Sequence, residues 1–180
     1  KIAFTGGTQT GRKVAKNAAE NLVSCNLELG GKSPQVIYAD ADFDRALNGV
    51  VAGVFAASGQ TCVAGSRAFV ERPIYDDFVQ ALVERANMIN IGIPTDDKTQ
   101  MGPLALKAQL DKVTNIVSKS VHEGAQIVAG GERLKSPGWF FPPTVAVDVN
   151  NSMNICKEEI FGPVVCVMPF DNEKDLIKMA

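Results

Sequence analysis

The stretch DFDRALNGVVAGVFAASGQTCVAGSRAFVE (residues 42–71) combines a helical pattern, a polar loop and a strand. Asp42 is a typical N-cap residue, and the apolar residues after it recur at the i, i+3, i+4, i+7 spacing of one helix face. These residues are Phe43, Ala46, Leu47, Val50, Val51, Val54 and Phe55. The helical pattern ends at Ser58 and Gly59, and the apolar segment AFVE (68–71) predicts a strand.

Helical and strand patterns alternate along the rest of the chain. Strands are predicted at residues 2–5, 25–29, 35–38, 126–129, 140–147 and 164–170. Further helices are predicted around 14–22, from 74 to about 89, at about 104–122 and in the final segment DNEKDLIKMA. Because strands that alternate with helices usually pair in parallel, we expect an α/β fold with a largely parallel sheet.

Composition excludes several classes of function. The 180 residues are 46% hydrophobic and 21% charged, which is ordinary for a globular domain. A net charge of -2 gives no electrostatic reason to expect nucleic acid or an anionic membrane, and no apolar run is long enough to span a bilayer. We therefore expect small-molecule chemistry. The chain opens on KIAFTGG without an initiating Met and stops within a helical pattern, so we also expect a piece of a larger protein.

The cysteines indicate a reducing compartment. Cys25, Cys62, Cys156 and Cys166 lie far apart without a C-x-x-C pair, and His122 is the single histidine. This argues against a structural zinc site and against a disulfide scaffold, so no metal is expected and the cytoplasm is the expected location. Three of the cysteines lie in apolar or strand-like settings and are expected to be core thiols, whereas Cys62 lies in a polar loop.

Three loops could carry chemistry. GGTQTG (6–11) lies between a strand and a helix, where free backbone N–H groups suit a phosphate, although a tight turn would look the same. Glu28 lies in an otherwise apolar strand pattern and is either a buried general base or a solvent-facing glutamate. Cys62 follows a helix in a loop whose glycines allow a ligand to approach the backbone, although a loop cysteine by itself is often incidental.

Taken together, four segments resemble the motifs of the aldehyde dehydrogenase superfamily, in the order of that family. They are FTGGTQTGR (4–12) for the cofactor loop, LELGGKSP (27–34) for the glutamate, GQTCVAGSR (59–67) for the nucleophile and EEIFGPV (158–164) for the ribose contact. The resemblance implies a twisted, mostly parallel sheet flanked by helices. It also implies that residues 1–29 are the end of the cofactor-binding domain and that residues 30–180 are most of the catalytic domain.

The resemblance also assigns roles to individual residues. It implies that Cys62 is the nucleophile, that its backbone N–H forms half of an oxyanion hole, and that Glu28 is the general base. Glu159 would hold hydroxyls of the nicotinamide-side ribose, with Phe161 beside that ribose and ring. The remaining cofactor-binding residues would be Gly6, Gly7 and Leu29. Gly7 stands where the family usually has serine, so a hydroxyl contact to the pyrophosphate is absent.

The implied activity is oxidation of an aldehyde to a carboxylic acid through a thiohemiacetal and a thioester on Cys62. The implied cofactor is NAD or NADP, with NAD favoured, and the parent protein is expected to be a homodimer or homotetramer. Glu28 favours hydrolysis of the thioester over transfer of the acyl group to coenzyme A. Two other classes stay open: a cysteine hydrolase or acyltransferase, for which His122 is the only histidine, and a domain that folds without turning over.

Overall fold

The helix expected after Asp42 is α2 (Phe43–Phe55). The Asp42 carboxylate caps it by accepting a hydrogen bond of 3.1 Å from the Arg45 backbone N–H. The apolar stripe of α2 is buried through Leu47, Val50, Val54 and Phe55. A short 3-10 turn, η1 (Ala56–Gly59), follows directly and leads into the cysteine loop.

The computed structural model describes residues 1–180, which divide into two compact units, Lys1–Gly31 and Lys32–Ala180. The first unit contains β1 (Ile2–Thr5), α1 (Thr8–Glu20) and β2 (Cys25–Glu28). Its two strands are parallel, with Ile2 opposite Cys25 and Thr5 opposite Glu28. Parallel neighbours need a crossover connection, and α1 supplies it. Glu28 therefore ends its strand beside the glycine loop that begins at Gly6.

The second unit is built on a five-stranded sheet with the order β3-β4-β7-β6-β5. Its strands are β3 (Pro34–Ile37), β4 (Arg67–Glu71), β7 (Val164–Phe170), β6 (Thr144–Val147) and β5 (Gln126–Ala129). All neighbours are parallel except β5 and β6, which are antiparallel with a bulge between Ile127 and Ala129. The continuous apolar sequence of β7 fits its central position, because a strand covered on both faces has no polar side.

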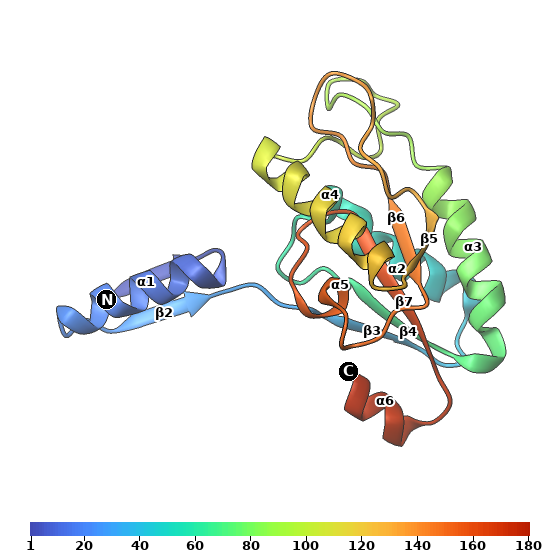
Figure 1. Cartoon of the computed structure of the whole chain (residues 1–180), viewed down its shortest axis with the longest axis horizontal. Helices are drawn as coiled ribbons and strands as arrows, with labels where there is room; N and C mark the ends of the chain where they lie inside the picture. Colours follow the sequence, from blue (N-terminus) through green and yellow to red (C-terminus); the bar gives the residue numbers. More distant parts are fainter. The chain divides into compact units, whose positions relative to one another are not determined.

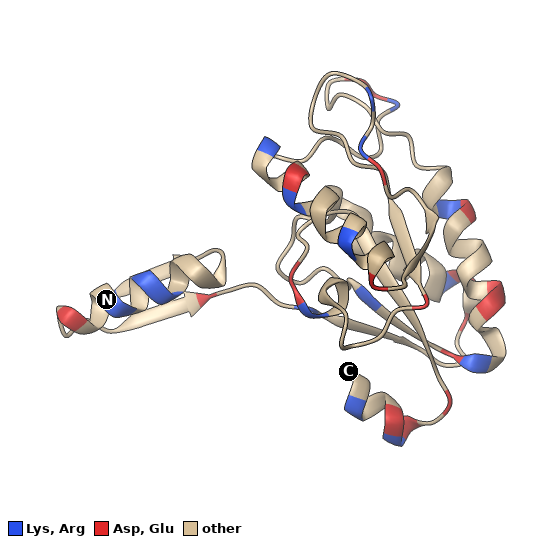
Figure 2. Cartoon of the chain, in the orientation of Figure 1, with Lys and Arg blue, Asp and Glu red and all other residues tan.

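Helices cover both faces of this sheet (Figure 1). Alternate residues of β7 point to opposite faces: Val165 and Val167 pack with α2 and with α3 (Tyr75–Asn87). Cys166 and Met168 pack on the other face with α4 (Lys107–His122) and the one-turn helix α5 (Asn154–Lys157). The C-terminal α6 (Glu173–Met179) adds Leu176 to that second cluster. Charged side chains of both signs are scattered over these helices (Figure 2).

Two predicted element boundaries are wrong. The strand predicted over 140–147 begins only at Thr144, because Pro142 and Pro143 have no backbone N–H to donate to a neighbouring strand. The helix predicted from 104 begins at Lys107, because the backbone N–H of Leu104 instead donates to the Trp139 carbonyl. The remaining predicted strands and helices are present within two or three residues of their expected bounds, or somewhat earlier in the case of α1. None of the helices is long and apolar enough to cross a membrane.

Candidate active site

Cys62 lies in an exposed turn that follows a strained segment of backbone. Ala57, Ser58 and Gly59 all have left-handed φ angles of 49°, 56° and 71°. Such angles are uncommon outside glycine, so contacts elsewhere must hold this backbone in place. One of them is the buried Ser58 hydroxyl, which donates a hydrogen bond of 2.9 Å to the Gly102 carbonyl. The turn itself closes where the Ala64 N–H donates to the Thr61 carbonyl, at 3.2 Å.

The cysteine loop packs directly against the segment that contains Glu159 and Phe161. A Cβ added to Gly59 would lie 2.1 Å from the carbonyl oxygen of Gly162, so the two backbones are in contact. Only glycine fits at position 59, both for this reason and for its positive φ. The structure therefore brings two of the predicted motifs, the nucleophile loop and the EEIFGPV segment, to one place in the second unit.

Gln35 of β3 holds the other end of the cysteine loop. Its side-chain amide donates a hydrogen bond of 2.7 Å to the Gly65 carbonyl. A Cβ on Gly65 would lie 2.4 Å from the Gln35 side chain, which would then have to move. The backbone N–H of Cys62 makes no hydrogen bond within the chain, and it is free to bind an oxyanion.

Helix α4 fixes the segment 158–164 through two side chains. Gln109 Nε2 donates hydrogen bonds of 2.7 and 2.8 Å to the carbonyls of Ile160 and Phe161. Lys112 Nζ donates one of 2.7 Å to the Glu159 carbonyl. Phe161 has a left-handed φ of 57°, which these contacts stabilise. The sequence analysis missed Gln109 and Lys112, because both lie in a helix that carries no motif and was recognised only by its apolar periodicity.

Two polar atoms near this segment are buried without partners. They are Glu159 Oε1 and Lys32 Nζ, and neither makes a hydrogen bond in the structure. Burial lowers the pKa of Lys32, although the nearby Glu159 carboxylate acts in the opposite direction. A buried acceptor without a donor is costly unless a ligand supplies one, so Glu159 Oε1 fits a ribose hydroxyl.

The first unit holds the other predicted cofactor residues. Gly6 donates its backbone N–H to the Glu28 carbonyl at 3.0 Å, and Gly7 is the N-cap of α1. No side chain caps this helix, and its first turn has no acidic residue, so its N–H groups fit a phosphate. Leu29 packs on Gly11 of the same helix, where an added Cβ would meet the Leu29 side chain at 2.5 Å. The Glu28 side chain is exposed within this unit.

The other three cysteines and the histidine form no hydrogen bond with Cys62. Cys156 and Cys166 are buried as expected, whereas Cys25 is only half-buried in β2. His122 is the exposed last residue of α4 and makes no hydrogen bond to Cys62. The structure therefore gives the thiol no histidine base, which argues against a cysteine hydrolase.

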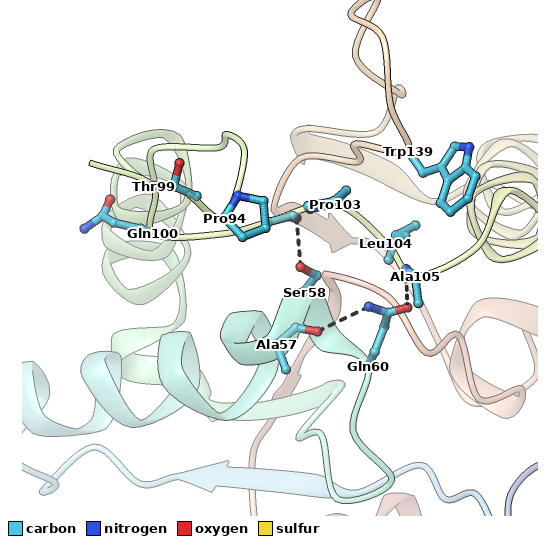
Figure 3. Close-up of a pocket in the computed structure, with 11 residues that line it drawn as sticks. Ala57, Ser58, Gln60, Pro94, Thr99, Gln100, Pro103, Leu104, Ala105 and Trp139 are labelled. Atoms are coloured by element: carbon cyan, nitrogen blue, oxygen red, sulfur yellow. Dashed lines mark hydrogen bonds between the residues drawn. The ribbon is translucent and has the colours of Figure 1, made fainter. Parts of the chain in front are cut away.

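A cavity of about 590 Å³ opens beside the residues that precede Cys62 (Figure 3). Ser58 and Gln60 form one wall, and Pro94 and Trp139 lie across from them. The Gln60 side-chain oxygen accepts a hydrogen bond of 3.1 Å from the Ala105 backbone N–H, which ties the cysteine loop to the start of α4. This size suits a small-molecule ligand, and the cavity makes the loop accessible from that side.

Comparison with known proteins identifies the family. A model of the Aldehyde dehydrogenase family matches residues 1–180, which is the whole chain. The chain belongs to the aldehyde dehydrogenase family. The aldehyde dehydrogenase of Bacillus cereus, solved in complex with NAD+, superposes on 99% of the chain with a TM-score of 0.98 and 47% identity. The betaine aldehyde dehydrogenase of Staphylococcus aureus, also in complex with NAD+, superposes on 99% with a TM-score of 0.96 and 41% identity.

Curated proteins that are similar in sequence are also dehydrogenases. A (Z)-2-((N-methylformamido)methylene)-5-hydroxybutyrolactone dehydrogenase of Acinetobacter baylyi is 44% identical over 99% of the chain. A betaine aldehyde dehydrogenase of Sinorhizobium fredii is 44% identical over the full chain. The chain spans 37 and 38% of the length of these two relatives, and 36% of the Bacillus cereus structure. The aldehyde dehydrogenase fold expected from the four motifs is thereby confirmed.

Proposed function

We propose that the chain carries the catalytic centre of an enzyme that oxidises an aldehyde to a carboxylic acid with a nicotinamide cofactor. The observation that supports this most is the exposed Cys62, which follows a strained backbone turn in a chain that belongs to the aldehyde dehydrogenase family. Cys62 is the nucleophile in this proposal. A thiol suits the role because it attacks well as the thiolate and is a good leaving group from an acyl-enzyme.

In the proposed reaction, the Cys62 thiolate attacks the aldehyde carbon and forms a thiohemiacetal. The free backbone N–H of Cys62 then stabilises the oxyanion, because an unpaired donor aimed at a developing charge needs no reorganisation. A bound nicotinamide cofactor would supply the acceptor for the hydride of this intermediate. A thioester on Cys62 remains, and Glu28 takes a proton from the water that hydrolyses it.

The cofactor-binding residues in this proposal are those that the family motifs mark. Glu159 holds ribose hydroxyls through its unpartnered Oε1, and Phe161 lies beside the ring. Gly6, Gly7 and Leu29 shape the phosphate site at the start of α1. NAD is favoured over NADP because the structural neighbours from Bacillus cereus and Staphylococcus aureus are NAD+ complexes. The Staphylococcus aureus neighbour and the Sinorhizobium fredii relative are both named betaine aldehyde dehydrogenases. Betaine aldehyde is therefore the substrate to test first.

A chimaera tests the proposal, since the chain spans about a third of its relatives. The chain replaces the matching segment of the Bacillus cereus aldehyde dehydrogenase, and formation of reduced nicotinamide is followed by absorbance with betaine aldehyde or a short aliphatic aldehyde. The expected result is turnover that Cys62→Ser abolishes and that Cys25→Ser leaves intact. Turnover that persists in the Cys62→Ser chimaera would contradict the assignment.

The role of Glu28 is tested separately in the same chimaera. We expect Glu28→Gln to slow hydrolysis of the thioester, because the amide cannot accept the proton of the attacking water. The acyl group should then accumulate on Cys62 and be detected by mass spectrometry of the intact protein. Glu20→Gln, in an exposed position at the end of α1, is the matched control and should not accumulate it. Unchanged hydrolysis in Glu28→Gln would contradict the role of Glu28 as the base.

A further inference from the structure

Two buried thiols that interact with each other stand, in the sequence, on either side of the segment that carries Glu159 and Phe161. Cys156, in α5, is 3% exposed, and Cys166, in the central strand β7, is fully buried. Both belong to the same hydrophobic cluster. Cys166 Sγ lies 3.7 Å from the carbonyl oxygen of Ile155, the residue directly before Cys156, and accordingly donates a hydrogen bond there. The two cysteines are free, so the pair is a reduced dithiol.

The surroundings of the pair make the two thiols unequal. The interaction between the two thiol side chains lowers the pKa of Cys156 and raises that of Cys166. The cations of Lys32 and Arg67 further lower the pKa of Cys156, whereas burial and the Glu123 carboxylate raise it. Lys32 Nζ has no hydrogen-bond partner, so its field is not offset by a fixed anion in direct contact. These directions favour Cys156 over Cys166 as the attacking thiol.

The positions of the two cysteines in the chain determine which segment a bond between them would close. Cys156 and Cys166 stand on either side of the segment 158–164, which connects α5 to β7. A bond between them would close residues 156–166 into a loop. Such a bond sets the sulfur–sulfur separation at about 2.05 Å and fixes α5 to β7. Because Glu159 lies two residues after the end of α5, this constraint would act on its position.

We propose that Cys156 and Cys166 form a peroxide-oxidisable dithiol whose disulfide closes the loop that carries Glu159 and Phe161. The Cys156 thiolate attacks one oxygen of hydrogen peroxide, the O–O bond breaks, and the released hydroxide takes a proton to become water. Sulfur then attacks sulfur: the S–S bond forms, the S–O bond of the Cys156 sulfenic acid breaks, and the hydroxyl leaves as water with the Cys166 proton. In total, two thiols and one peroxide give one disulfide and two waters.

A small oxidant can reach the pair through α5. This helix is a single turn of four residues, and exposed residues flank it on both sides, with Ser152 before it and Lys157 and Glu158 at its end. A single helical turn can open locally without unfolding of the whole domain. Hydrogen peroxide is close to water in size, so a brief opening of α5 admits it. The disulfide is reversible by exchange with a small thiol, unlike higher oxidation states.

Formation of the disulfide is tested on the full 180-residue chain, treated with hydrogen peroxide, alkylated and digested with trypsin. Because Lys157 lies between the two cysteines, reduced protein gives separate peptides 136–157 and 158–174. The expected result is one cross-linked peptide that is lighter by about two hydrogen atoms than the sum of its parts. It should disappear on reduction with dithiothreitol and in Cys156→Ala, and persist in Cys25→Ala. Alkylated Cys156 and Cys166 with no cross-link, at peroxide levels that oxidise Cys62, would overturn the proposal.

The order of reaction is tested with a trap for sulfenic acid. Removing the second thiol should leave the first oxidation product exposed to the trap, so Cys166→Ala is expected to give dimedone-labelled Cys156. Cys156→Ala is expected to leave Cys166 unlabelled. The reverse pattern, with label on Cys166 only, would overturn the assignment of Cys156 as the attacking thiol.

The consequence for cofactor binding rests on the proposed function and is measured separately. In the chimaera, oxidation should weaken NAD binding, and dithiothreitol should restore it. A Cys62→Ser background removes oxidation of the nucleophile from the comparison, and Cys156→Ala should make binding insensitive to peroxide. A cross-link that forms without any change in NAD binding overturns this consequence and leaves the disulfide itself established. If the reduced chimaera binds no NAD, the proposed function fails, and the cross-linking result still decides the chemistry of the dithiol.

Discussion

At the scale of single residues, Gly59 is the position where the cysteine loop tolerates least change. Its φ of 71° and its contact with the Gly162 carbonyl leave no room for a side chain. We predict that Gly59→Ala lowers the free energy of unfolding by about 1–3 kcal/mol through backbone strain, with a further cost from displacing the 158–164 segment. Urea denaturation measures this change as a lower midpoint.

Gly49 provides the matched control, because it lies in α2 and an added Cβ would meet no atom within 4 Å. Gly49→Ala should raise the free energy of unfolding by about 0.5–1 kcal/mol, since alanine loses less backbone entropy in a helix. If both glycine variants shift the midpoint in the same direction, the close approach of Gly59 to Gly162 is not what limits this site.

Tyr75 makes the stability of the second unit depend on pH in the alkaline range. Burial, with smaller contributions from Asp148 and Asp76, raises the pKa of Tyr75 from 10.0 to about 12. Its hydroxyl also donates to the Val167 carbonyl at 3.4 Å. Between pH 10 and about 12 the unfolded chain releases a proton that the folded chain keeps, so the free energy of unfolding should fall as the pH rises through this window.

Removing the Tyr75 phenol should remove this contribution. In Tyr75→Phe, the free energy of unfolding from denaturant titrations should fall less between pH 10 and 12 than in the wild type. Tyr38→Phe keeps the Tyr75 phenol and should keep its share of the decline. An identical decline in the wild type and in Tyr75→Phe would mean that another group governs the alkaline limit.

At the scale of elements, α4 acts as a support for the cofactor segment. The two hydrogen bonds from Gln109 reach carbonyls 51 and 52 residues further along the chain. We predict that Gln109→Ala costs about 1–3 kcal/mol, at about 0.5–1.5 kcal/mol for each hydrogen bond lost. Local opening should increase, so backbone amides within 158–164 should exchange faster in hydrogen–deuterium exchange.

Asn115 lies in the same helix with its side chain exposed, and Asn115→Ala is the control for a change of helix propensity. It should leave exchange of the 158–164 amides unchanged. Equal exchange in Gln109→Ala and Asn115→Ala would show that the carbonyl contacts of Gln109 do not hold the segment.

The elements that the sequence predicted well are those with strong local signals. The Asp42 cap and the apolar stripe of α2, and the continuous apolar run of β7, follow from the residues themselves. The four-residue α5 has no comparable periodicity, and it was not predicted. The strand predicted over 140–147 is too long: its apolar residues favour a strand, but Pro142 and Pro143 cannot donate a hydrogen bond to the sheet.

The candidate site could be predicted only in part from the sequence, because only some of its features have a local pattern. Glycine and polar residues mark the loop of Cys62, and the family motifs mark Glu28, Glu159 and Phe161. The left-handed backbone at Ala57 was not predicted, because alanine has no preference for that conformation. The contact between Gly59 and Gly162 was also missed: it joins segments about a hundred residues apart, and local patterns carry no information on it.

At the scale of the whole molecule, the two units differ in how much core they have. Ala18 is the only buried apolar residue of the first unit, and all others lie between Ile37 and Leu176. A unit of about 30 residues without disulfides or metal is too small to fold on a core of that size. The second unit has two clusters, one on each face of its five-stranded sheet, which is enough for an independent domain.

We therefore predict that residues 32–180 fold without the first unit, whereas a peptide of residues 1–31 does not fold in isolation. The shortened chain should unfold cooperatively at the midpoint of the full chain, because the residues removed bury almost no apolar surface of their own. Circular dichroism during urea denaturation compares the two proteins, with the full chain as the reference. A shortened chain with a clearly lower midpoint would show that the first unit stabilises the sheet, and that the two units depend on each other for folding.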